Sequence, residues 1–146
     1  MNTTKPMRRA ATFAAALLLA ACASTGPSVS GNWKDLGTTS NGNITTAIDT
    51  GSIRKNGNLV TFRDKKTVKK PGEEQYANTP KYKTAVGEWE IHCTNKTYRI
   101  TGLQLLDEKG TVLTSQKFTA VAVRPMSVMS GSVTEKQFEE ACGKKL

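Results

Sequence analysis

The sequence predicts an α+β domain in which about five or six short β-strands come before a single C-terminal helix. Three observations support this prediction. Short runs of residues alternate between apolar and polar side chains, which is the periodicity of a half-buried strand. Clusters of Gly, Asn, Asp, Pro and Ser separate these runs. Near the C-terminus, Ser132 and Glu135 are spaced as in the capping box that opens a helix.

The first strand is expected over 32–36, around Trp33, and a turn follows at 40–43. A second run, 44–53, is interrupted at Asp49-Thr50-Gly51, which indicates a bulge or a bend. Asn56-Gly57 then predicts a β-hairpin with a type I′ turn, whose return strand covers 59–63.

Residues 64–83 are polar, basic and rich in turn residues, so we expect a strand that frays into a long basic loop or hairpin tip. The clearest strand is 83–93. There, three residues that point to one side alternate with three that point to the other: Trp89, Ile91 and Cys93 against Glu88, Glu90 and His92. Further strands are expected over 97–106 and 111–115, joined by a turn at 107–110.

The end of the chain combines an irregular segment with the predicted helix. Residues 116–131 have no clean period, and we expect them to pack over the core, with one extended piece. The helix begins after Ser132 and ends at Gly143, a suitable residue for a left-handed cap. Four residues fall near one face of this helix: Val133, Phe138, Ala141 and Cys142.

The N-terminus has the pattern of an export signal. Three basic residues and no acidic residue come before an apolar run over 10–21, which is shorter than the roughly 20 residues a spanning helix needs. The run ends in Leu19-Ala20-Ala21-Cys22, which resembles the lipobox of bacterial lipoproteins. The resemblance implies removal of a signal peptide, residues 1–21, and acylation of Cys22. The alternative is an ordinary signal peptide with a cysteine near its end.

An acylated Cys22 would anchor the chain in a lipid bilayer, because two or three acyl chains give stable membrane attachment. Ala23 follows the cysteine, and lipoproteins without Asp at this position are expected in the outer membrane. Residues 22–31 are small and polar with one proline, which predicts a lipidated flexible tether, and 32–146 then form the domain. The side of the membrane that the domain faces stays open.

Two further cysteines, Cys93 and Cys142, remain once Cys22 is assigned to the lipid. An even pair in an exported protein favours a disulfide, which would join the C-terminal helix to the strand that carries Trp89. Two free thiols or a metal pair are the alternatives. A metal pair lacks a nearby second ligand, since His92 would point to the other side of the strand.

The chain is basic, and one segment concentrates the charge. Removing Lys5, Arg8 and Arg9 with the signal leaves 18 bases and 12 acids, so the net charge falls from +9 to +6. Such a surface favours acidic partners: lipopolysaccharide phosphates, sulfated glycans or acidic host proteins. Tyr76 and Tyr82 could stack on sugar rings or pack at a partner interface. The candidate residues for an acidic ligand are Arg63, Lys65, Lys66, Lys69, Lys70, Lys81 and Lys83.

The alternative for this segment is a solvated hairpin whose lysines prevent pairing between sheet edges. Because the protein is predicted to be exported, we expect no nucleic-acid partner. The chemistry-bearing residues predict a protein that is not an enzyme and needs no cofactor or metal. His92 is the only histidine, its neighbours on the strand face are acidic, and there is no nucleophile elbow, phosphate loop or paired metal motif.

Several features in order resemble the surface-adhesin protein E family of Gram-negative lipoproteins, over roughly residues 31–142. They are Trp33, Ile48-Asp49-x-x-Ser52-Ile53-Arg54, Gly57-Asn58-x-Val60-x-Phe62, Ile91-x-Cys93, Tyr98-Arg99 and the helix with its cysteine. The resemblance implies a mainly antiparallel sheet with a packed helix, closed by the disulfide, and a surface role in adhesion to host matrix proteins. Arg63 stands where members often have an aromatic residue, and the basic segment looks expanded.

Three functions are therefore expected in decreasing order. The first is a surface-exposed, adhesin-like lipoprotein that binds host or envelope macromolecules. The second is a periplasm-facing lipoprotein with a structural or assembly role. The third is a small-ligand binder, for example of haem, with His92 as a ligand and a cleft lined by aromatic residues.

Overall fold

The computed structural model describes residues 29–39, 41–74 and 76–146. The predicted signal peptide, Cys22 and the tether up to residue 28 lie outside these ranges, so they remain predictions. Val29 and Ser30, near the end of the tether, contact the domain. The carbonyl oxygens of Val29 and Ser30 accept hydrogen bonds from Trp33 Nε1 (2.8 Å) and Arg63 (2.9 Å).

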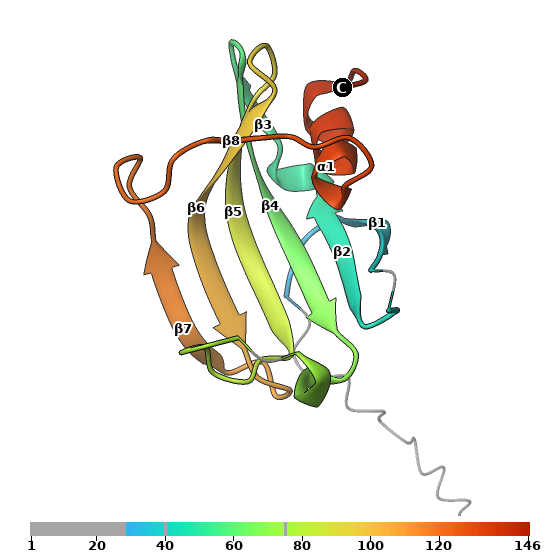
Figure 1. The fold of residues 1–146 in the computed structure, drawn as a ribbon, viewed down its shortest axis with the longest axis vertical. Helices are drawn as coiled ribbons and strands as arrows, with labels where there is room; N and C mark the ends of the chain where they lie inside the picture. The colour runs from blue at the N-terminus through green and yellow to red at the C-terminus, as the bar shows by residue number, and fades with distance from the viewer. Residues whose placement is uncertain (1–28, 40, 75) are drawn as a thin grey trace, which may run out of the picture.

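Eight strands and one α-helix make up the described chain (Figure 1). The helix α1 (Val133–Cys142) follows all the strands, as predicted, and is neither long nor apolar enough to cross a membrane. The strands are β1 (Trp33–Thr38), β2 (Ile44–Asp49), β3 (Arg54–Asn56), β4 (Leu59–Val68), β5 (Thr84–His92), β6 (Thr97–Leu106), β7 (Val112–Lys117) and β8 (Met126–Ser127).

The strands form one antiparallel sheet in the order β1-β2-β4-β5-β6-β7. The short β3 pairs with the beginning of β4, and the two-residue β8 pairs with the beginning of β6. Neighbours in the sheet are mostly neighbours in the chain, because short turns connect antiparallel strands directly. The mainly antiparallel sheet with a C-terminal helix is confirmed.

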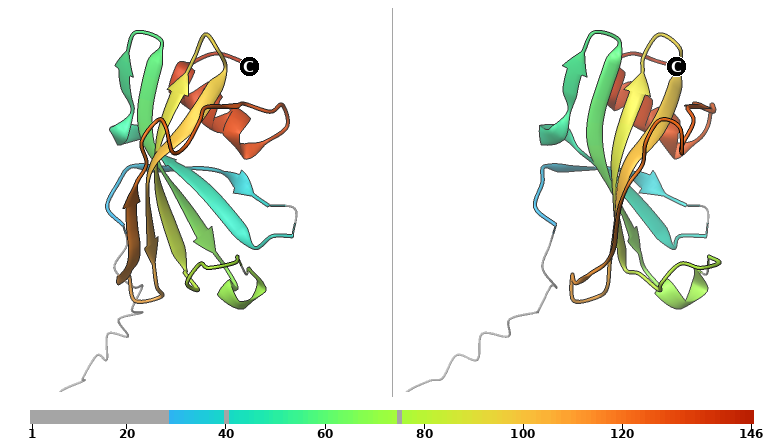
Figure 2. Two further views of the ribbon diagram at one scale, coloured as in Figure 1. Left: turned by 60° about the vertical axis from the view of Figure 1, so that its left-hand side comes forward. Right: turned by 90° about the vertical axis from the view of Figure 1, so that its left-hand side faces the viewer.

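The helix covers only one end of one face of the sheet (Figures 1 and 2). A cluster of buried apolar side chains lies beneath it, and Phe138 of α1 is fully buried against them. Burial of such a side chain contributes roughly 1.5–3 kcal/mol to folding. The other members of the cluster are Leu36, Ile48, Val60, Phe62, Trp89, Ile91, Val128 and Ala141.

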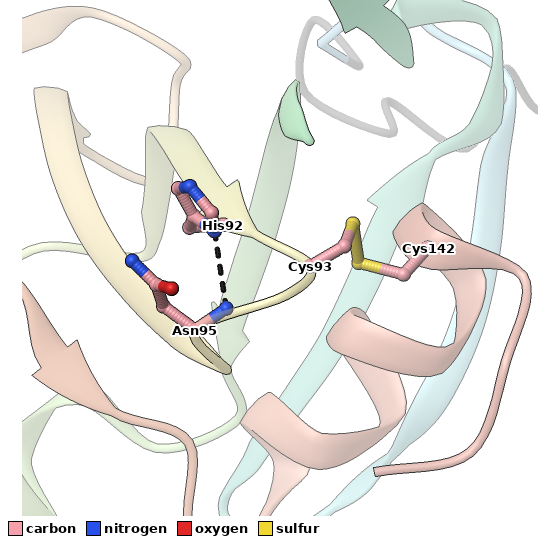
Figure 3. The surroundings of a disulfide bond; sticks show 4 residues. All are labelled: His92, Cys93, Asn95 and Cys142. Carbon is pink, nitrogen blue, oxygen red and sulfur yellow. Dashed lines mark hydrogen bonds between the residues drawn. A yellow bond between two sulfur atoms is a disulfide. The ribbon is translucent and has the colours of Figure 1, made fainter. Parts of the chain in front are cut away.

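The disulfide between Cys93 and Cys142 closes this end, with a Cα–Cα distance of 5.7 Å (Figure 3). Cys93 directly follows β5 and Cys142 is the last residue of α1, so the bond ties the helix to a central strand. Both helix caps are as expected. Ser132 Oγ accepts from the Glu135 amide, and Gly143 ends the helix in the left-handed conformation (φ 68°).

Two local predictions were wrong. β4 does not fray after Arg63, because its ladder with β5 continues to the Thr67–Thr84 pair. The hairpin between β3 and β4 exists, but only Gly57 of its two loop residues has a positive φ (61°). A type I′ turn needs positive φ at both central positions, so this turn is of another type.

The bend after β2 and the irregular segment after β7 were predicted correctly. Asp49 caps a single 3₁₀ turn (Thr50–Ser52), and the Ser52 hydroxyl accepts the Arg63 amide hydrogen at 2.8 Å. The segment after β7 crosses the sheet through β8 and buries Val128 in the core. Its Val121 and Met129 remain exposed.

Candidate binding surface

The predicted basic residues do not form one loop, because β4 distributes them over both faces of the sheet. Successive residues of a strand point to opposite sides. Lys66 therefore lies on the face covered by α1, together with the buried Phe62 and Asp64. Arg63 and Lys65 lie on the opposite face, which we call the outer face.

On the outer face, two cations stack on one aromatic ring. Lys65 Nζ lies 4.6 Å from the ring centroid of Trp33, and the Arg63 guanidinium lies 5.4 Å from it. A cation over an indole face contributes about 0.5–1 kcal/mol at exposed sites. Partial burial lowers the pKa of Lys65. Trp33 of β1 thus orients the basic side chains of β4.

Arg63 is also a structural residue, because it binds the buried carboxylate of Asp49 at 2.5 Å. Asp49 accepts further hydrogen bonds from the Asn32 amide (2.9 Å) and the Gly51 amide (3.1 Å). Burial opposes ionisation, but these donors outweigh it and hold the pKa of Asp49 below its usual range. The Asp-x-x-Ser-Ile-Arg stretch shapes a bend, as expected.

The remaining basic residues lie on the connecting segment, defined here as residues 69–74 and 76–83, between β4 and β5. This segment lies at the end of the sheet remote from the disulfide (Figure 1). Lys70 pairs with Glu73 at 3.3 Å, and Lys83 Nζ donates to the Lys69 carbonyl at 3.0 Å. Within the described residues, the exposed Lys69 and Lys81 form no ion pair with a carboxylate.

Sequence reasoning missed a buried polar cluster on the helix-covered face. Asp64, only 2% exposed, accepts hydrogen bonds from Gln137 of α1 (2.8 Å) and the Gly87 amide (3.2 Å), and it forms an ion pair with Lys66. One feature of the sequence could have revealed this cluster. Asp64 and Lys66 occupy positions in β4 that continue the alternation of the buried Val60 and Phe62. The other partners of Asp64, Gln137 and Gly87, come from distant segments, which the pattern could not indicate.

Beside this cluster, an apolar cavity of about 270 Å³ lies on the same face of the sheet. The sheet forms its floor, and Tyr76 and Tyr82 of the connecting segment line it. Burial, with the nearby Tyr76 and Glu74, raises the pKa of Tyr82. The sequence singled out both tyrosines as candidate stacking residues, and the structure brings them together with Trp89.

His92 does not line this aromatic cavity. It lies at the end of β5, and its Nδ1 accepts a hydrogen bond from the Asn95 amide at 3.1 Å (Figure 3). The two ingredients of the haem hypothesis, the histidine and the aromatic cleft, are therefore not brought together. Among the described residues, no group of three or more His, Cys, Asp and Glu side chains is arranged to hold a metal ion.

Comparison with known proteins identifies the family. The family model of surface-adhesin protein E matches residues 33–143, which is most of the chain and nearly all of the described domain. The chain belongs to the surface-adhesin protein E family. This membership suggests an adhesin at the cell surface, and a protein without catalytic activity. No curated protein and no solved structure matches the chain.

Proposed function

We propose that this family member is an outer-membrane lipoprotein, anchored through acylated Cys22, whose surface-exposed domain binds acidic macromolecules of the host or envelope. The observation that carries the proposal is the placement of Lys65, Lys69 and Lys81. They lie along β4 and the connecting segment, where Lys69 and Lys81 are exposed and without a carboxylate partner among the described residues.

Electrostatics supports binding of the domain to acidic macromolecules. The chain beyond the predicted signal has a net charge of +6, so it attracts polyanions over about one Debye length, roughly 8 Å at physiological salt. Cations paired with carboxylates contribute less to this attraction, because their field is compensated nearby. Sulfated glycans, lipopolysaccharide phosphates and acidic host proteins offer the complementary charge.

Heparin binding tests the proposal with a matched control. The triple variant Lys65→Gln, Lys69→Gln and Lys81→Gln removes three charges from the proposed surface. The control variant Lys55→Gln, Lys96→Gln and Lys144→Gln removes three exposed charges near the disulfide. We expect the first variant to weaken binding at least tenfold and to flatten its salt dependence, whereas the control changes binding less than twofold. Equal losses in both variants would show that only total charge matters.

Protease treatment of intact cells tests surface exposure. The proposal expects the domain to be digested in intact cells. A domain that resists protease until the outer membrane is permeabilised would instead support the periplasm-facing structural or assembly role. The isolated domain, digested under the same conditions, shows whether resistance comes from the fold itself.

The anchor is tested by Cys22→Ala. We expect mass spectrometry of the wild-type protein to show an acylated N-terminal Cys22, and we expect the variant to leave the membrane fraction. An unmodified Cys22 in the mature wild-type protein would contradict the anchor and leave the binding surface to be judged by the heparin experiment.

A further inference from the structure

We infer that the aromatic cavity is a binding site for a compact, uncharged aromatic molecule that carries one hydrogen-bond acceptor. The floor of this site is the helix-covered face of the sheet, opposite Lys65, and only the connecting segment borders both this site and the proposed basic surface. The inference depends on the walls of the cavity, on its polar end and on one unpaired donor.

The walls of the cavity favour an aromatic body. Tyr76, Tyr82 and Trp89 contribute three aromatic side chains, and Ile100 and Leu105 of β6 contribute aliphatic surface. Ligand pockets usually measure about 300–1,000 Å³, so a cavity of about 270 Å³ suits a molecule of one or two rings. Aromatic groups that meet at offset or edge-on angles gain stabilisation beyond that of their buried area.

The polar end of the cavity favours an uncharged ligand. Asp64 is almost completely buried, and Lys66 is its counter-ion. The Lys66 ammonium also lies 4.9 Å from the ring centroid of Trp89, at the side of the cavity. A ligand carboxylate or ammonium would add an uncompensated charge to this neutral pair in a mostly apolar site, which is costly.

The donor is the indole N–H of Trp89. Trp89 is only 6% exposed, and its Nε1 is the one buried side-chain nitrogen or oxygen among the described residues that lacks a hydrogen-bond partner. An unpaired buried donor is unfavourable, so a ligand acceptor that reaches it, after a small shift of the side chains that cover it, gains affinity.

Gly87 makes room for this donor beside the cavity. A Cβ atom at position 87 would lie 2.6 Å from Trp89 Nε1 and 2.5 Å from Asp64 Oδ1, and Nε1 is the indole atom nearest to it. Gly87 itself lines the cavity. The absence of a side chain at position 87 therefore makes room for the buried indole N–H beside the cavity, near the Asp64 carboxylate.

Benzyl alcohol, benzoate and benzylamine form a matched set of probes, because they share one ring and differ in charge. The readout is the indole N–H signal of Trp89 in nitrogen–proton NMR spectra of the folded domain. The chain has two tryptophans, so the signal that remains in the variant Trp33→Phe belongs to Trp89. For an eight-atom probe we expect a dissociation constant on the order of 1 mM. Benzyl alcohol should shift the Trp89 signal until the site is saturated. The two charged probes should bind at least tenfold more weakly.

Two pairs of variants locate the site. Ala85→Leu fills the cavity from its floor and should abolish the shift, whereas Val86→Leu, on the opposite face of the same strand, should leave it. Lys66→Met removes the counter-ion of Asp64 and should raise benzylamine binding at least tenfold, whereas Lys65→Met should not. Variants are compared only where the Trp33 indole signal shows a folded domain.

Three results would overturn the inference. The first is a Trp89 signal that benzyl alcohol leaves unshifted up to about 20 mM, an order of magnitude above the expected constant. The second is an equal shift of the Trp89 signal in Ala85→Leu and in wild-type protein, which would place the probe outside the cavity. Equal binding of all three probes would reject the argument from charge and leave only non-specific apolar contact.

Discussion

The two ends of the sheet are held together in different ways. At one end, which we call the closed end, α1, the disulfide and fully buried Phe138 and Ile91 make a continuous apolar core. At the other, the open end, the same face of the sheet carries a cavity beneath the connecting segment, whose Tyr76 is 51% exposed. The difference indicates that stability is concentrated at the closed end, while the open end is available for ligands.

The polar cluster of Asp64 marks the boundary between these ends. Gln137 reaches it from α1, and the Gly87 amide reaches it from β5. Buried polar groups that satisfy one another fix a unique arrangement, because any displacement leaves a group unpaired. Asp64 therefore fixes the edge of the helix-covered core and, with Lys66, forms the polar wall of the cavity.

The largest expected effect comes from the disulfide at the closed end. The double variant Cys93→Ala and Cys142→Ala removes a cross-link with a sequence separation of 49, which should lower the free energy of unfolding by roughly 4 kcal/mol. Urea denaturation measures this loss, and reduction of the wild-type domain should reproduce it. A loss below about 1 kcal/mol would mean that the helix is held without the cross-link.

The next effect concerns Asp49, which joins the bend after β2 to Arg63 and Asn32. Because the folded protein holds the pKa of Asp49 below its usual range, its contribution is present above the unfolded pKa of about 3.9 and is lost as the pH falls through the folded value. Asp49→Asn should cost about 2 kcal/mol at pH 7. Stability measured against pH should show the two proteins converging below pH 4. A constant difference would contradict this assignment.

At the boundary, Gln137→Met should cost about 1 kcal/mol, because Asp64 keeps Lys66 and the Gly87 amide but loses one buried hydrogen bond. The helix keeps its length and cap. Glu139→Met, on the more exposed side of the same helix, serves as the control and should stay within about 0.5 kcal/mol of wild type. Equal losses of thermal stability in Gln137→Met and Glu139→Met would show that the hydrogen bond of Gln137 to Asp64 does not stabilise the fold.

The smallest expected effect is at the open end. Tyr76→Ala should change the free energy of unfolding by less than about 0.5 kcal/mol, since half of the side chain is exposed and its hydroxyl contacts Glu74 at only 3.4 Å. The same variant should weaken benzyl alcohol binding at least threefold. A large loss of stability would mean that the connecting segment belongs to the core.

Local patterns predicted the strands well where one face is buried and the other is not. Trp89, Ile91 and Cys93 lie on the side of the core, and His92 on the other, as their alternation indicates. The helix was equally clear, because Ser132 and Gly143 act as caps within a few residues of sequence. Such signals depend only on near neighbours.

The candidate site was less predictable, because its parts meet through strand register and long-range contacts. Lys65 and Lys66 are adjacent in sequence but lie on opposite faces, so treating them as one basic loop was an error about secondary structure. The bonds of Asp64 to Gln137 and of Arg63 to Asp49 join distant segments. No local pattern specifies those partners.

Hydrogen exchange, followed by mass spectrometry with and without heparin, tests most directly the claim that stability lies at the closed end and binding at the open end. The account predicts slow exchange around Ile91 and Phe138 that heparin leaves unchanged. It predicts fast exchange in the connecting segment that heparin slows. Two results would contradict it: heparin slowing exchange only at the closed end, or fast exchange around Phe138 without heparin.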